Sequence, residues 1–187
     1  MSQTDTNENF ATLLWIDCEM SGLDPASDKI LEIAVILTDD HLEQTIEGPS
    51  LAIKVDDEII KNMDEWNTKT HTESGLVDLC ASGVSIQKAE KAIIEFIEQN
   101  KAYPDDNLEL CGSSVWHDLF FLRKEMPTLC NTQIRAVPVL DVSSIAFNES
   151  LINPDYKAYK KNRTHRAMDD IKESIAELRY LRDLHWE

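Results

Sequence analysis

The stretch LLWIDCEM (residues 13–20) places two carboxylates within an apolar run that is typical of a buried strand. Side chains two positions apart on a strand point to the same face, so Asp17 and Glu19 are expected to project together from its end. Adjacent carboxylates repel each other and are costly to bury without a cation, and oxygen ligands suit Mg²⁺ or Mn²⁺. The alternative interpretation is an exposed strand end with two solvated acids.

The composition argues against one class of binding partner. The 187 residues suffice for one domain with a sizeable core, and 18 basic against 35 acidic residues give a formal net charge of −17. This balance argues against capture of long DNA or RNA on a basic surface, because neutralising phosphates drives such binding. It allows a metal site and a small anionic substrate, although the charge can also serve only to keep the protein in solution.

Cysteine usage and the N-terminus indicate a cytoplasmic protein. The four cysteines show no C-x-x-C spacing, and Cys18 and Cys111 lie within apolar strands like small buried side chains in a reducing compartment. Residues 1–10 are polar and acidic, unlike a signal peptide, and no apolar run is long enough to span a membrane. We expect a disordered start over 1–10 and a single domain over 11–187.

Hydrophobic periodicity predicts strands first and then alternating helices and strands. This order indicates an α/β domain built around a mixed central sheet that is flanked by helices. The strands are expected at 13–19, 29–38, 45–55, 108–112 and 137–142, and the helices at 56–67, 85–99, 115–126 and 164–186. The segment 66–76 reads either as a binding loop or as a helix end with a half-buried Trp66. The segment 148–163 is irregular and carries a basic cluster, Lys157, Lys160, Lys161 and Arg163, that either holds phosphate or is solvated.

Further acids fall near helix starts. Asp118 lies in the first turn of its helix, where it either caps the helix or serves as a third metal carboxylate. On the last helix, a wheel at about 100° per residue puts Asp170 beside the apolar stripe and Asp169 nearly opposite it. Asp170 is therefore the better candidate for a buried site. His165 converges with Asp170 only if it lies at the frayed helix start or on the preceding loop.

Four acids and one histidine together point to metal-dependent hydrolysis. The five residues are Asp17, Glu19, Asp118, His165 and Asp170. Two cations about 4 Å apart, shared among such acids, can activate a water and steady the leaving oxygen of an in-line phosphoryl displacement. The imidazole of a histidine gains and loses protons near neutral pH, so it can accept the proton of that water.

The chain resembles the oligoribonucleases, of the exonuclease superfamily named for four acids and a histidine (DEDDh). The matching segments are WIDCEMSGLDP at 15–25, MDEWNTKTHTESGL at 63–76, CGSSVWHD at 111–118, LDVSS at 140–144 and THRAMDDIKESIAELRYLR at 164–182. The resemblance implies a ribonuclease H-like fold and a homodimer. It also implies 3′→5′ hydrolysis of short RNA, especially dinucleotides, to mononucleotides with two Mg²⁺ or Mn²⁺ ions.

The resemblance also implies a role for individual residues. Asp17, Glu19, Asp118 and Asp170 match the family's metal ligands, and His165 matches its general base. The residues that match substrate contacts are Leu23 (a wedge against a base), Trp66 (base stacking), and His71, Ser114 and Ser143 around the 5′ phosphate. A pocket closed at that phosphate fits two nucleotides and needs no long basic groove.

One segment departs from the family. Before LDVS the family carries a Tyr-Arg pair that reaches the partner's substrate, whereas this chain has Ile134-Arg135-Ala136-Val137-Pro138-Val139. The departure keeps a second hypothesis open, the same chemistry on DNA dinucleotides or longer single strands. A non-catalytic relative is disfavoured because none of the five catalytic positions is altered. Trp116, beside Asp118, is either packing or an alternative stacking surface.

Overall fold

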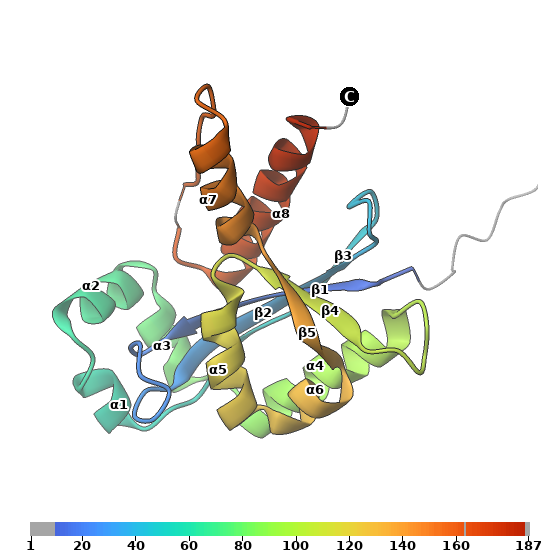
Figure 1. Ribbon diagram of the computed structural model, residues 1–187. Coiled ribbons are helices and arrows are strands. Elements are labelled where there is room, and N and C mark those ends of the chain that lie inside the picture. The colour runs from blue at the N-terminus through green and yellow to red at the C-terminus, as the bar shows by residue number, and fades with distance from the viewer. Residues whose placement is uncertain (1–9, 163, 186–187) are drawn as a thin grey trace, which may run out of the picture.

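The computed structural model describes residues 10–162 and 164–185. They form a central five-stranded sheet of order β3-β2-β1-β4-β5 with helices around it (Figure 1). The β1–β2 and β2–β3 pairs are antiparallel, whereas β1–β4 and β4–β5 are parallel. The strands are β1 (Leu13–Met20), β2 (Ile30–Thr38), β3 (Thr45–Ala52), β4 (Leu108–Gly112) and β5 (Ile134–Asp141). The predicted mixed sheet is confirmed. The stretch 1–10 expected to be disordered, apart from Phe10, and Arg163 of the basic cluster lie outside the described residues.

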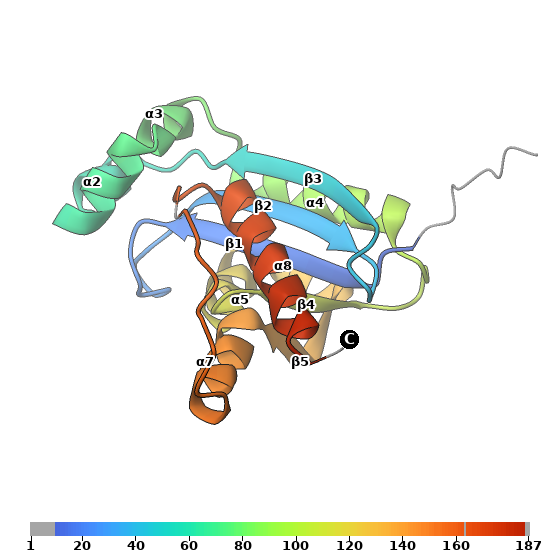
Figure 2. The same ribbon diagram turned by 90° about the horizontal axis from the view of Figure 1, so that it is seen from above.

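Helices cover both faces of the sheet. The helices are α1 (Asp57–Lys61), α2 (Glu65–Glu73), α3 (Leu76–Ala81), α4 (Ile86–Asn100), α5 (Val115–Glu125), α6 (Pro127–Thr132), α7 (Val142–Ile152) and α8 (Ala167–Asp183). Figure 2 shows α8 crossing one face of the sheet, with α4 behind the opposite face. None of the helices in the described part of the chain has the length and apolar character that crossing a membrane requires.

The alternation of side chains along β1 supplies both layers of the core. Leu14 and Ile16 belong to the larger core, which includes residues of α4, α5 and α6. Leu13 and Trp15 belong to the core formed with α8. Side chains alternate along a strand, so Asp17 and Glu19 point to the same side as Leu13 and Trp15, toward the face of the sheet that α8 covers. β2 is buried along its whole length because both layers cover it.

The region before α4 is more helical than the sequence indicates. The helix expected over 56–67 is interrupted after Lys61, because Asp64 accepts a 2.7 Å hydrogen bond from the Asn67 N–H and caps a new helix, α2. The segment 66–76, which the sequence left open between a loop and a helix end, is largely α2 and the start of α3. Trp66 is the second residue of α2 and is well exposed.

The last helix starts later than expected, at Ala167 and not at residue 164. His165 lies on the segment before α8 with φ = 53°, in the left-handed region. This is the position that the helix wheel required if His165 and Asp170 were to converge. The neighbouring segment is more regular than expected, because α7 extends to Ile152.

Candidate active site

The acid pair lies at the edge of the sheet where the parallel strands β1 and β4 both end. Asp17 and Glu19 occupy the last half of β1, and Asp118 follows β4 in the first turn of α5. Asp118 is buried, and its Oδ1 accepts a 2.8 Å hydrogen bond from the backbone N–H of Cys18. Carboxyl ends of parallel strands are where α/β sheets gather their functional side chains.

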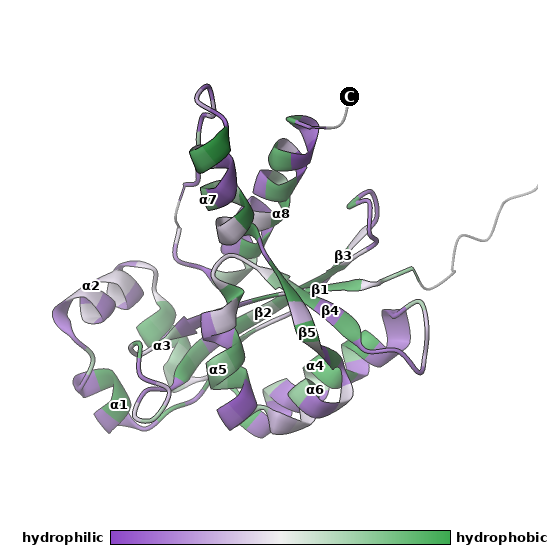
Figure 3. Ribbon diagram, in the orientation of Figure 1, coloured by the Kyte–Doolittle hydropathy of each residue, from purple (hydrophilic) through white to green (hydrophobic). Residues whose placement is uncertain are grey.

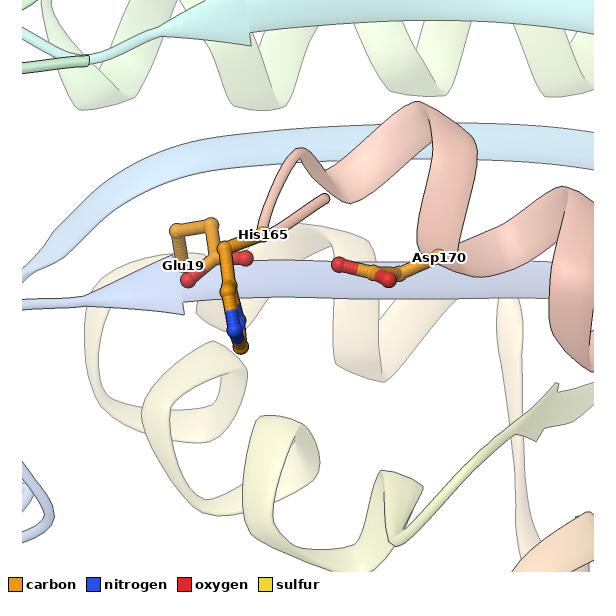
Figure 4. A group of neighbouring side chains, drawn as sticks. All are labelled: Glu19, His165 and Asp170. Atoms are coloured by element: carbon orange, nitrogen blue, oxygen red, sulfur yellow. The ribbon is translucent and has the colours of Figure 1, made fainter. Parts of the chain in front are cut away.

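The start of α8 brings the other two predicted residues to this edge. Figure 4 shows Glu19 on β1 facing His165 and Asp170, which come from the segment before α8 and from its first turn. One potential ligand atom from each of Glu19, His165 and Asp170 lies within 4.8 Å of the other two. The structure thus brings together residues that are about 150 positions apart in the chain.

Burial and mutual repulsion raise the carboxyl pKa values of this cluster. Burial raises the pKa of Asp17 well above its usual range, and the charges of Asp118, Glu19 and Asp170 raise it further. Burial, with the charge of Asp170, raises the pKa of Glu19 to about 8. Burial raises the pKa of Asp118 to about 7 against the opposing hydrogen bond from Cys18, and burial also raises the pKa of Asp170. Buried acids that repel one another fit a site built for a divalent cation.

Two cations flank the acid cluster, and each already has a carboxylate partner. Arg166 pairs with Glu32 at 2.8 Å, and Lys161 pairs with Glu177 at 2.7 Å. Arg166 lowers the pKa of Glu19, and Lys161 lowers those of Asp17 and Asp170, without reversing the net upward shifts. Protein cations therefore compensate only part of the negative charge in this cluster.

A cleft of about 230 Å³ opens beside the acids. Its walls include Asp17, Glu19 and Asp118 together with Leu23 and Trp66. Leu23 is 79% exposed and Trp66 is 59% exposed. The Trp66 ring also meets the His165 ring edge to face, with centroids 5.5 Å apart. The exposed apolar groups and the acids therefore share one opening.

Two serine hydroxyls meet near the end of β5. The Ser114 and Ser143 Oγ atoms are 3.1 Å apart. Asp141 holds both residues, because its Oδ1 accepts from the Ser143 hydroxyl at 2.6 Å and from the Ser114 backbone N–H at 2.9 Å. Ser114 lines the cleft directly, and Ser143 is not part of the lining.

Comparison with known proteins places the chain in a family. A family model described as Exonuclease matches residues 14–178. The oligoribonuclease of Pseudomonas syringae pv. syringae (strain B728a) is 44% identical over 178 residues, covering 94% of this chain and 97% of the relative. That of Klebsiella pneumoniae subsp. pneumoniae is 45% identical over 179 residues, covering 95% and 96%. The chain belongs to the oligoribonuclease family.

Solved structures with the same fold are more distant from this oligoribonuclease-family chain in sequence. Exonuclease I from Methylocaldum szegediense gives a TM-score of 0.67 at 15% identity, covering 92% of this chain and 40% of that one. The zinc-bound complex of E. coli exonuclease I with single-stranded DNA gives a TM-score of 0.71 at 15% identity, covering 94% of this chain and 41% of that one. This chain spans about two fifths of those solved chains. The likeness confirms the predicted ribonuclease H-like fold.

The structure buries His71, the residue for which the family resemblance implies contact with the 5′ phosphate. It is buried with 1% exposure beneath the acid pair, where its Nε2 lies 2.9 Å from the Met20 carbonyl oxygen. Its Nδ1 lies 3.9 Å from Glu19 Oε2 and has no hydrogen-bond partner among the described residues. In this geometry His71 contacts the Met20 backbone and does not line the cleft.

Three supporting residues of this oligoribonuclease-family site were not predicted from sequence. Asp141 positions both serines, and His117 holds the Leu23 loop with Nε2 at 3.1 Å from the Leu23 carbonyl oxygen. Glu32 anchors Arg166 from inside β2. Asp141 carried a usable signal, since an acid directly before a helix is a typical N-cap. The contacts of His117 and Glu32 join distant parts of the chain, so local sequence patterns do not reveal them.

Proposed function

We propose that this protein is a 3′→5′ exoribonuclease that hydrolyses short RNA, especially dinucleotides, to nucleoside 5′-monophosphates. One observation carries the proposal: four carboxylates and a histidine from three separated parts of the chain meet beside an opening lined by exposed Leu23 and Trp66. The oligoribonuclease relatives, at 44–45% identity over nearly their whole length, support it.

In this proposal Asp17, Glu19, Asp118 and Asp170 hold two divalent ions, Mg²⁺ or Mn²⁺. The ions, when bound, supply an activated water and stabilise charge on the leaving oxygen. His165 accepts the proton of the attacking water, which its position beside Glu19 and Asp170 allows. The raised carboxyl pKa values support this donor set, because they identify acids that gain most from a cation.

Substrate recognition is proposed to use both ends of the cleft. Leu23 wedges against one base, and Trp66 stacks on a base. Neither side chain has to leave the core to do so, because both are already exposed. Ser114 and Ser143, held by Asp141, bind the 5′ phosphate. Phosphate binding by His71, implied by the resemblance, would require its buried Nδ1, which has no hydrogen-bond partner among the described residues, to become accessible from the cleft. A closed phosphate end limits the substrate to very short chains.

A second candidate is the same chemistry on DNA dinucleotides or longer single strands. The altered segment before Leu140 supports it. Arg135 lies at the start of β5, where its Nε pairs with Glu109 at 3.0 Å, and is not at the phosphate end. Val137, Pro138 and Val139 have apolar side chains, so this stretch of β5 offers no side-chain donor to a phosphate. The solved E. coli exonuclease I complexes contain single-stranded DNA.

The deciding experiment is a timed digestion with Mg²⁺ of 5′-labelled RNA of two to about seven nucleotides, with a deoxy-dinucleotide in parallel. Far faster loss of the RNA dinucleotide supports the first proposal. Equal shortening of longer RNA, or faster loss of the deoxy substrate, favours the second. An Asp17→Ala variant that folds and still hydrolyses at the native rate would contradict the two-metal proposal.

The protein is also proposed to form a homodimer through an apolar surface on β5, α5 and α7. Its exposed side chains are Trp116, Val137, Ile145, Phe147, Leu151 and Ile152. Figure 3 shows hydrophobic residues along β5 and at the end of α7. Trp116 is 51% exposed and lines a cavity with Pro138 and Ile145, so it belongs to this surface and not to the core. Patches of this kind mark interaction sites.

We further propose a cytoplasmic location. All four cysteines are free thiols, and Cys18, Cys80 and Cys111 are buried. Buried free thiols are typical of a reducing compartment.

A further inference from the structure

Three carboxylates on α8 are spaced four residues apart and therefore lie along nearly the same side of the helix. They are Asp169, Glu173 and Glu177, which we call the carboxylate ladder. Asp170, the proposed metal ligand, lies beside the ladder and is not part of it. The ladder is unexplained by the proposed catalytic roles, and like charges four residues apart disfavour a helix unless other groups compensate them.

Each rung of the ladder holds one residue of the segment that carries His165. Glu177 pairs with Lys161 Nζ at 2.7 Å. Glu173 Oε1 accepts from the Asn162 backbone N–H at 2.7 Å. Asp169 Oδ2 accepts from the Thr164 hydroxyl at 3.2 Å. The segment therefore runs back along α8, and each successive contact lies closer to the start of the helix.

A fourth carboxylate holds the other side of His165. Glu32, on β2, is 1% exposed and receives two N–H groups of Arg166, with Nη2 at 2.8 Å from Oε1 and Nε at 3.1 Å from Oε2. Its Oε2 also accepts from the Ala167 backbone N–H at 3.3 Å. Contacts with carboxylates thus begin directly on both sides of His165.

His165 needs such support. Its φ of 53° is in the left-handed region, which a side chain with a Cβ adopts only when its surroundings hold it there. The Trp66 ring that touches it is itself exposed and offers an edge contact only. Glu177 is 8% exposed, and burying an ion pair contributes little stability compared with apolar packing. A role in positioning explains why the charges are kept.

We propose that the carboxylate ladder fixes the backbone on the N-terminal side of His165, so that Glu173 and Glu177 are positioning residues for the proposed general base. The inference rests on the proposed function for its effect on turnover. Its structural content, an ordered His165, does not depend on which substrate is used.

The test compares Glu173→Ala with Glu173→Gln, because glutamine keeps an oxygen that accepts from the Asn162 N–H. Glu177→Ala, which removes the partner of Lys161, completes the set. Asp183→Ala, which removes an exposed acid at the far end of α8, is the matched control for charge. The readouts are kcat and KM on the RNA dinucleotide, the His165 imidazole NMR signal in metal-free protein, and Tm.

We expect Glu173→Ala and Glu177→Ala to lower kcat about tenfold or more with KM nearly unchanged, since small misplacements of a reacting group cost this much. The His165 signal should move toward that of an exposed histidine. Glu173→Gln should restore most of the lost kcat, and Asp183→Ala should match the native protein in every readout.

The proposal is overturned if Glu173→Ala leaves both kcat and the His165 signal unchanged, or if Glu173→Gln is as impaired as Glu173→Ala. If Glu177→Ala does not fold, the comparison of Glu173→Ala with Glu173→Gln still decides the matter. A native protein without activity on short RNA would contradict the proposed function, and the NMR signal would then test the ladder alone.

Discussion

The backbone N–H of Cys18 donates a 2.8 Å hydrogen bond to Asp118 Oδ1. Cys18 lies between Asp17 and Glu19, so the strand that carries the first two acids also fixes the third. Its own side chain points to the opposite face, where it packs in the larger core. A short alternation of polar and apolar residues thus ties the acid cluster to the most buried part of the molecule.

The first prediction concerns Asp118→Asn. The amide keeps an oxygen that accepts from Cys18 and removes one charge from a repelling cluster. We expect the Tm of metal-free protein to stay equal or rise, while turnover of the RNA dinucleotide falls at least about a hundredfold, because the asparagine is a weaker cation ligand. Thermal melts in a chelator and single-turnover rates measure the two effects. Near-native turnover in this variant would mean that Asp118 only caps α5.

The second prediction is a pH-dependent metal response. The pKa of Glu19 is raised from 4.5 to about 8, and that of Asp118 from 3.8 to about 7. Between these values the folded protein holds more protons than the unfolded chain, so stability of the metal-free protein should fall as pH rises from about 4 to about 8. Cation ligands must be deprotonated, so Mn²⁺ should raise Tm more at the upper end of this range than at the lower. Equal gains in Tm on adding Mn²⁺ at both ends of this pH range would contradict the prediction.

The third prediction concerns base stacking by Trp66. Because the ring is 59% exposed, Trp66→Ala should change Tm little. Loss of base stacking, worth about 1–3 kcal/mol, should raise KM for the RNA dinucleotide by about 5-fold to about 150-fold. The KM of Trp66→Phe should lie between those of the native protein and Trp66→Ala. Leu79→Ala, at an exposed apolar position on α3, is the control. An unchanged KM in Trp66→Ala would place the bases elsewhere.

The sequence reveals the local part of this architecture. The period of two in β1 predicts that Asp17 and Glu19 share a face, and the wheel of the last helix selects Asp170 over Asp169. What it does not reveal depends on contacts between distant segments. His71 is a polar residue in what looked like a loop, and only folding shows it buried at Met20. Asp169 is unremarkable by periodicity, and its contact with Thr164 exists only because the preceding segment folds back along α8.

The last prediction addresses assembly. Phe147 is 65% exposed and Leu151 is 68% exposed, and both lie on α7 at the proposed dimer surface. Phe147→Asp with Leu151→Asp places two charges in an apolar contact, so the mass measured by light scattering should fall from dimer to monomer. Leu79→Asp, an exposed leucine on α3, should leave the mass unchanged. A native protein that is already monomeric would contradict the proposed homodimer.

The same double variant shows whether the partner contributes to the site. The altered β5 segment adjoins α7 and Ser143 lies in its first turn, so a partner bound at the proposed dimer surface would lie near the phosphate end of the cleft. If the partner completes that end, the monomer should lose activity on 5′-phosphorylated dinucleotides while binding Mn²⁺ as the native protein does, measured by the Tm gain. Full activity in the monomer would mean that Ser114, Ser143 and the acid cluster suffice within one chain.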